Sequence, residues 1–358
     1  MFKLSYDDEL RLSRMLLRAC GMPEPDADLA GSVITHSDFT GVYSHGISRL
    51  TGYLRLFRKG AYNPRPKVTV IKDEPSVIEL DCDNALGVVT VNRAFDMLLP
   101  KAREHGIAIC TGRRSSNIGC ASYYGWRAAE NDVIALVCCN TYLSMAPFGG
   151  AERLIGTNPI VIGVPTRSEY PIVMDISTSG VAMGKIKALG REGKELPPGW
   201  ANDIDGRPTT DPDKAYTVLP IARHKGYGLA VMVDIVCGVL SGACFGRDIG
   251  SAAKGESENT GFCMIIIDPA HFMPIEDFKR RADEYVRMMK HSRPADGVEE
   301  IFLPGEIEFR YFENARREGI DVSVALQDEL ITLAVELGVV PPDSNFSTLV
   351  DTARTVKL

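Results

Sequence analysis

The chain has 358 residues, of which 45% are hydrophobic and 24% are charged, and its formal net charge is −7. This composition is that of an ordinary globular protein with a large core, and the length suggests about two domains. The acidic balance argues against nucleic acid as the main partner, and no segment approaches the ~20 apolar residues of a membrane span. The first residues lack a basic stretch leading into an apolar one, so we expect a cytoplasmic protein.

Nine cysteines lie mostly inside apolar runs, and none of them forms a Cys-x-x-Cys pair. An odd number without paired spacing predicts neither a disulfide framework nor a zinc ribbon. Free thiols of this kind are typical of a reducing compartment, which agrees with a cytoplasmic location. The six histidines show neither i,i+4 nor His-x-His spacing, so we expect no metal site.

The first part of the chain is predicted to be helical. Ser5 and Asp8 resemble a capping box that opens a helix over residues 5–19. A second helix is predicted over residues 23–38. A third helix is expected to begin at Ser44, a favourable N-cap residue.

The middle of the chain alternates between strand and helix signals, which is typical of an α/β fold. The predicted strands are residues 77–80, 107–110, 134–139, 160–164, 172–176 and 262–267. The predicted helices between them are residues 90–104, 121–130 and 226–240. Residues 190–213 are rich in Gly, Pro and Asp and are expected to form a long loop.

After residue 275 the pattern becomes helical again, over residues 275–290, 305–318 and 322–337. We therefore expect helices from both ends of the chain to pack together around a central mixed β-sheet. The predicted domains are a discontinuous helical domain, residues 1–72 plus 280–358, and a central α/β cofactor-binding domain, residues 73–279.

The segment from Gly41 to Tyr53 holds the most informative side chains. If His45 is set at zero on a helix, Arg49 falls at about 40° and Tyr53 at about 80°. The apolar residues fall at about 120–200°, so these three polar side chains lie outside the apolar stripe. Arg49 could hold a carboxylate and His45 could move a proton near the helix N-terminus. The alternative is a structural helix start with a solvated histidine and arginine.

A second polar feature, Arg223-His-Lys-Gly-Tyr-Gly228, opens the apolar helix predicted over residues 226–240. Its glycines permit close backbone approach, and Lys225 at a helix N-terminus suits a phosphate, although glycine there could merely turn the chain. There is no Gly-x-Gly-x-x-Gly after a strand and no P-loop or Gly-x-Ser-x-Gly motif. A standard Rossmann, P-loop or serine-hydrolase site is therefore not supported.

Seven blocks, which include both of these features, occur in a recognisable order through most of the chain. They are residues 41–53, 146–159, 173–179, 184–185, 206–212, 224–229 and 303–305. Together they resemble the type-2 malate/L-lactate dehydrogenase family, which includes ureidoglycolate, sulfolactate and diketogulonate oxidoreductases and cyclic-imine reductases.

The resemblance implies hydride transfer between NAD or NADP and C2 of a small 2-hydroxy or 2-oxo acid, malate- or lactate-like. It also implies a non-Rossmann NAD(P)-binding fold and a homodimer with sites near the subunit interface. By matching position, His45 would be the catalytic proton donor and acceptor. The substrate-binding residues would be Ser44, Arg49, Tyr53 and Asn117. The cofactor-binding residues would be Thr141, Asp175, Ile176, Ser177, His224, Lys225 and Gly305.

One block departs from the family pattern. Many relatives carry a histidine in Ser-Asn-His-x-Gly, whereas Ser115-Ser-Asn-Ile-Gly119 places Asn117 at that position. Asparagine can hydrogen-bond a substrate oxygen but cannot exchange a proton near pH 7. Two alternatives therefore stay open. One is a piperideine- or pyrroline-2-carboxylate reductase of the same family, and the other is a non-catalytic nucleotide-binding paralogue.

Overall fold

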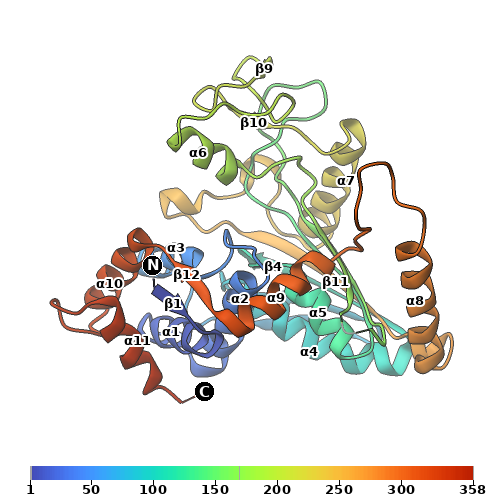
Figure 1. Ribbon diagram of the computed structural model, residues 1–358, viewed down its shortest axis with the longest axis horizontal. Coiled ribbons are helices and arrows are strands. Elements are labelled where there is room, and N and C mark those ends of the chain that lie inside the picture. The colour runs from blue at the N-terminus through green and yellow to red at the C-terminus, as the bar shows by residue number, and fades with distance from the viewer. Residues whose placement is uncertain (1, 169, 358) are drawn as a thin grey trace.

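The computed structural model describes residues 2–168 and 170–357 (Figure 1). At its centre lies a seven-stranded sheet in the order β2-β3-β4-β11-β5-β6-β7. Its strands are β2 (Thr69–Glu74), β3 (Val77–Asp81), β4 (Ile107–Ser115), β5 (Ile134–Cys139), β6 (Ile160–Val164), β7 (Ile172–Ile176) and β11 (Thr260–Ile267). Only β3 and β4 pair in parallel, and the other neighbours are antiparallel. Because a Rossmann sheet is mostly parallel, the prediction of a mixed, non-Rossmann α/β fold is confirmed.

Eleven helices occur within the described ranges. They are α1 (Tyr6–Ala19), α2 (Glu24–Phe39), α3 (Ile47–Arg58), α4 (Gly87–His105), α5 (Ser122–Glu130), α6 (Met183–Arg191), α7 (His224–Asp234), α8 (Ile275–Lys290), α9 (Glu306–Glu318), α10 (Val324–Glu336) and α11 (Phe346–Arg354). A π-helical turn, Ile235–Val239, extends α7. The predicted helix start is confirmed, since Ser5 Oγ accepts the Asp8 N–H at 3.2 Å and the Ser5 hydroxyl donates to Asp8 Oδ2 at 2.8 Å.

Helices cover both faces of the sheet, and the side chains of β5 alternate accordingly. Ala135 and Val137 pack in the cluster that holds the buried faces of α4 and α5. Leu136 and Cys138 belong to a second cluster with Val233 of α7. The middle of the sheet is therefore covered on two sides, whereas the edge strand β2 is exposed along its whole length.

The two ends of the chain meet in one further layer (Figure 1). The short strands β1 (Phe2–Leu4) and β12 (Ile320–Val322) pair antiparallel. One apolar cluster joins Leu16 of α1 and Leu54 of α3 to Leu330 of α10. The expected packing of helices from both termini is thus observed, while the domain boundaries at residues 72/73 and 279/280 stay a prediction.

The loop predicted over residues 190–213 is only partly a loop. The strands β8 (Ala201–Asn202) and β9 (Pro208–Thr209) lie within it and pair with each other, and β10 (Thr217–Val218) completes a small sheet. Strands of two residues are too short to show a period-2 pattern. Within the described parts of the chain, no helix combines the length and apolar character that a membrane crossing requires.

Candidate active site

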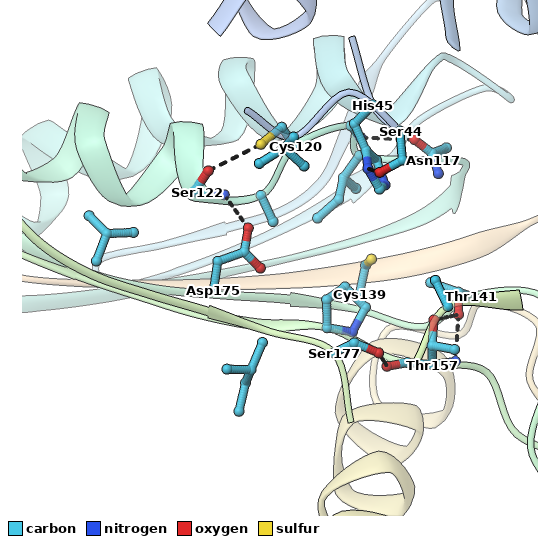
Figure 2. A pocket seen from close by; sticks show the side chains of 18 of the residues that line it. Ser44, His45, Asn117, Cys120, Ser122, Cys139, Thr141, Thr157, Asp175 and Ser177 are labelled. Atoms are coloured by element: carbon cyan, nitrogen blue, oxygen red, sulfur yellow. Dashed lines mark hydrogen bonds between the residues drawn. The ribbon is translucent and has the colours of Figure 1, made fainter. Parts of the chain in front are cut away.

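A cavity of about 710 Å³ lies between the α2–α3 turn, the β4–α5 connection, the ends of β5 and β7, and the start of α9 (Figure 2). Its size falls in the range of ~300–1,000 Å³ that is usual for small-molecule and cofactor sites. Nine of the twelve predicted site residues line it: Ser44, His45, Arg49, Asn117, Thr141, Asp175, Ile176, Ser177 and Gly305. Tyr53, His224 and Lys225 are not part of its lining.

The helix that carries Arg49 begins later than predicted. α3 starts at Ile47, so His45 lies in the preceding turn and not in the first helical turn. Ser44 does not cap the helix, because its Oγ lies 2.9 Å from His45 Nδ1. Asp38 of α2 acts as the cap instead, since its Oδ2 accepts the Ile47 N–H at 2.6 Å. The prediction of the helix start at Ser44 was wrong because the cap comes from another helix.

His45 is half-buried at the edge of the cavity. Burial and, to a smaller extent, repulsion by the neighbouring Arg49 guanidinium lower the pKa of its imidazole to about 4. The ring is therefore neutral near pH 7 and ready to accept a proton. With Nδ1 beside the Ser44 hydroxyl, Nε2 is the nitrogen available for exchange with a ligand.

Asn117 is held in one orientation by two donors. The Tyr53 hydroxyl donates to its Oδ1 at 2.6 Å, and the Gly119 N–H donates to the same oxygen at 2.9 Å. The side-chain amide of Asn117 is left as a donor toward the cavity, beside Ser44 and His45 (Figure 2). Tyr53 is completely buried, so it acts on this region through Asn117 rather than from the cavity wall.

A second part of the cavity has the features of an anion and nucleotide site. Asp175, at the end of β7, accepts the Ser122 N–H at the start of α5 at 2.8 Å (Figure 2). The first turns of α6 and α9 also reach the cavity, through Gly184 and Gly305. No atom lies within 4 Å of the Cβ position at Gly184, so the α6 N-terminus is open to a ligand. Helix N-termini favour phosphate groups, so this part fits a dinucleotide.

His224 and Lys225 form the first turn of α7, outside the cavity lining. The His224 ring packs edge-on against Phe148, with 5.9 Å between ring centroids. The turn before them is strained, because Ala222 and Arg223 both have positive φ angles, 45° and 57°. Within one chain, His224 and Lys225 thus lie apart from the other ten predicted site residues.

Glu258 lines the cavity and was missed by the sequence reasoning. It is 8% exposed, and its carboxylate accepts a hydrogen bond from the Tyr62 hydroxyl at 2.9 Å. Burial raises the pKa of this carboxyl. No signal in the sequence distinguishes Glu258 from Glu256, because both lie in one polar segment before β11. Ser122 and Glu308 are further polar lining residues that no motif had indicated.

Neither metal ligands nor disulfides are found in the described parts of the chain. No group of three or more His, Cys, Asp or Glu side chains there is arranged to hold a metal ion. All nine cysteines are free thiols.

Comparison with known proteins identifies the family. The family model for malate/L-lactate dehydrogenase matches residues 4–331, which is most of the chain. The chain belongs to the malate/L-lactate dehydrogenase family. The resemblance of the seven sequence blocks is thereby confirmed, and the protein is an enzyme of this family.

Three similar proteins show how far the similarity extends. L-sulfolactate dehydrogenase of Methanocaldococcus jannaschii is 36% identical, with 94% of this chain and 97% of the relative covered. The solved sulfolactate dehydrogenase structure from that organism has a TM-score of 0.89, 35% identity, and coverage of 97% and 99%. Malate dehydrogenase of Pyrococcus horikoshii is 35% identical over 95% and 99% of the two chains. The structure of Δ1-piperideine-2-carboxylate reductase from Pseudomonas syringae has a TM-score of 0.85, 29% identity, and coverage of 93% and 100%.

Proposed function

We propose that this enzyme transfers a hydride between a nicotinamide cofactor, NAD or NADP, and C2 of a small 2-hydroxy or 2-oxo acid. A malate- or lactate-like acid is the proposed substrate. One observation carries the proposal: His45, Arg49 and Asn117 line the same cavity as Asp175 and Ser177. A proton-transfer group, a carboxylate-binding group and a hydrogen-bond donor thus adjoin the residues matched to the cofactor.

Each side chain has a separate task in this proposal. The Arg49 guanidinium holds the substrate carboxylate, because its planar fork matches two carboxylate oxygens. The Asn117 amide donates to the oxygen on C2, and the neutral His45 accepts the hydroxyl proton during oxidation. Bound nicotinamide supplies or takes the hydride. In the reduction direction His45 returns the proton to the same oxygen.

The dinucleotide is proposed to occupy the part of the cavity at the ends of β5 and β7. There Asp175 lies in the last part of β7 and Ser177 directly follows this strand. Thr141 Oγ1 accepts the Thr157 N–H at 3.0 Å, which joins two loops of the wall. The N-terminus of α6, whose first turn holds no acidic residue, suits the pyrophosphate. Ile176 and Gly305 complete the proposed cofactor contacts.

A screen of 2-oxo acids and 2-hydroxy acids with NADH, NADPH and their oxidised forms tests the function. The absorbance of the reduced nicotinamide reports turnover directly. We expect turnover with at least one malate- or lactate-like acid. Binding of the dinucleotide without turnover of any acid or cyclic imine would instead identify a non-catalytic paralogue.

A cyclic-imine carboxylate reductase is the second candidate, and Asn117 is the observation that favours it. An imine nitrogen binds a proton in solution far more readily than a carbonyl oxygen does, so its reduction needs fewer acidic side chains. The structural similarity to the piperideine-carboxylate reductase agrees with this candidate. Faster turnover of piperideine- or pyrroline-2-carboxylate than of every 2-oxo acid in the screen would establish it.

We also propose that the enzyme is a homodimer. Five apolar side chains of α7 and the following turn are each more than 40% exposed: Leu229, Met232, Ile235, Val239 and Leu240. Apolar surface of this extent is typical of an interface. A second copy on this face would also lie near His224 and Lys225, at the start of the same helix. Light scattering of the purified protein should give the mass of two chains, and a monomer at micromolar concentration would refute the proposal.

A cytoplasmic location is proposed as well. The nine cysteines are free thiols, including Cys138 and Cys237, whose sulfur atoms lie 3.5 Å apart. An oxidising compartment would favour their oxidation. Fractionation of cells that express the enzyme at its native level tests the location, and recovery outside the cytoplasm would refute it.

The oriented amide of Asn117 leads to a prediction. We expect Asn117→Asp to lower kcat in the reduction direction by ~10²–10³-fold, because a carboxylate replaces a donor that faces developing negative charge. Tyr53→Phe should cost far less, since it removes only the hydroxyl that orients the amide. Steady-state kinetics with saturating cofactor measure both effects. Equal losses in the two variants would contradict a direct contact between Asn117 and the substrate.

The neutral state of His45 leads to a prediction about pH. The pKa of His45 in the free enzyme is lowered to about 4. Titration of His45 should therefore not change kcat/KM for oxidation between pH 5 and 8. The kcat/KM for reduction requires the protonated ring, so it should fall ~10-fold per pH unit over the same interval. A substrate carboxylate on Arg49 cancels part of the repulsion and raises this pKa in the complex. Profiles of kcat/KM against pH in both directions measure the difference. A break near pH 6.5 in both profiles would contradict the prediction.

A further inference from the structure

The start of α3 is held by a residue from another helix. Its N-cap is Gly46, which has no side chain to accept the amide groups of the first turn. The Asp38 carboxylate of α2 accepts the Ile47 N–H at 2.6 Å. The Gly46 carbonyl accepts the Arg49 N–H at 2.8 Å. The backbone from His45 to Arg49 is therefore tied to α2 at one point.

Gly46 and Asp38 occupy one shared space. A Cβ atom at Gly46 would lie 2.0 Å from both Cγ and Oδ1 of Asp38. The φ angle of Gly46 is −85°, so glycine is not needed here for a left-handed backbone. Glycine is required at position 46 for lack of space, because the Asp38 carboxylate lies where any larger residue would place its side chain.

A second buried carboxyl lies beside Asp38. Glu9 of α1 is 0% exposed and Asp38 is 2% exposed. Burial raises the pKa of Glu9 well above its usual value, and the neighbouring Asp38 raises it further. Two adjacent carboxyl groups in an apolar environment do not both ionise. Within the described residues neither Glu9 oxygen has a hydrogen-bond partner, so the Ile47 N–H is the group that holds the Asp38 carboxylate.

We propose that Asp38 is a positioning residue that fixes the first turn of α3, and that Gly46 is required to make room for the Asp38 carboxylate. Asp38 is not part of the cavity wall. It acts by holding His45 and Arg49 at the distance and angle that the reaction needs. The proposal rests on the proposed function, because it assigns His45 and Arg49 to the reacting substrate.

Substitutions of Asp38 test the contact. Asp38→Ala should lower kcat/KM for the substrate acid by ~10- to 100-fold, because small displacements of reacting groups have effects of that order. Asp38→Asn keeps an oxygen for the Ile47 N–H, so it should stay within ~3-fold of wild type. Ser13→Ala, one turn after Glu9 and equally buried, is the matched control. Wild-type kcat/KM in Asp38→Ala, or equal losses in Asp38→Ala and Asp38→Asn, would overturn the proposal.

Gly46→Ala provides a test of the shared space. Alone it should displace the carboxylate and reproduce the loss seen in Asp38→Ala. The double variant Gly46→Ala with Asp38→Ala has no carboxylate to displace, so its kcat/KM should be no lower than that of the worse single variant. A double variant in which the two losses multiply would show that the residues act independently.

A readout without turnover separates this proposal from the proposed function. Hydrogen exchange of the segment 42–57 should be faster in Asp38→Ala and unchanged in Asp38→Asn. If the wild-type enzyme turns over none of the acids, the proposed function fails, and this exchange pattern still reports whether Asp38 holds α3. Unchanged exchange in Asp38→Ala would overturn the positioning proposal whatever the activity.

Discussion

His45→Ala is expected to lower kcat by ~10²–10⁴-fold in both directions, the range usual for loss of a general acid or base. The ring is the titratable group beside the Asn117 amide and Arg49 in the cavity, and its Nε2 is available for exchange. Asn117 cannot replace it, because an amide does not exchange protons near neutral pH. Cofactor binding should be unaffected, since His45 lies away from the β7 end of the cavity.

The measurement for His45 is kcat at saturating cofactor, together with dinucleotide affinity from fluorescence titration. His291→Ala is a suitable control, because His291 is exposed and bonds only to the Arg287 carbonyl of its own helix. Partial rescue of His45→Ala by added imidazole would support the proton-transfer role. A His45→Ala enzyme with wild-type kcat would show that solvent or Glu258 carries the proton instead.

The strands that enclose the site could be predicted closely from the sequence. β5, β6 and β7 match their predicted bounds, because each is a short apolar run bounded by polar or turn-forming residues. Short pairings such as β1 with β12 were not found, since they depend on contacts between the two ends of the chain. The local sequence pattern therefore predicted individual strands, whereas the pairing of strands far apart in the chain could be seen only in the structure.

The active-site residues, too, could be predicted only where their spacing in the sequence identified them. His45 and Arg49 stand out because their spacing separates them from the apolar stripe, and both line the cavity. The helix start was wrong because Asp38, nine residues before Ile47, supplies the cap. Glu258 could not be predicted for a similar reason: its position beside the cavity results from the packing of β11 in the sheet. Residues that act through tertiary contacts leave no spacing to detect.

Arg49→Ala is expected to raise KM for the substrate acid by ~10- to 150-fold, as loss of hydrogen bonds to a charged group costs about 1.5–3 kcal/mol. KM for the dinucleotide should stay the same. Arg49→Lys should give an intermediate value, because lysine keeps the charge but not the planar fork. Removing Arg49 also removes its repulsion of the His45 ring, so the low pKa of that ring should rise toward its usual value.

These two consequences of Arg49→Ala can be separated by experiment. KM for the acid reports the lost carboxylate contact, and the pH profile of kcat/KM for reduction reports the shift of His45 to higher pH. Arg55→Ala is the matched control, because Arg55 lies on α3 but pairs with Glu329 at the surface. Exposed ion pairs of that kind contribute little, so its kinetics should resemble wild type. An Arg49→Ala enzyme with unchanged KM for every acid would place the substrate carboxylate elsewhere and leave His45 without the partner that this site assigns to it.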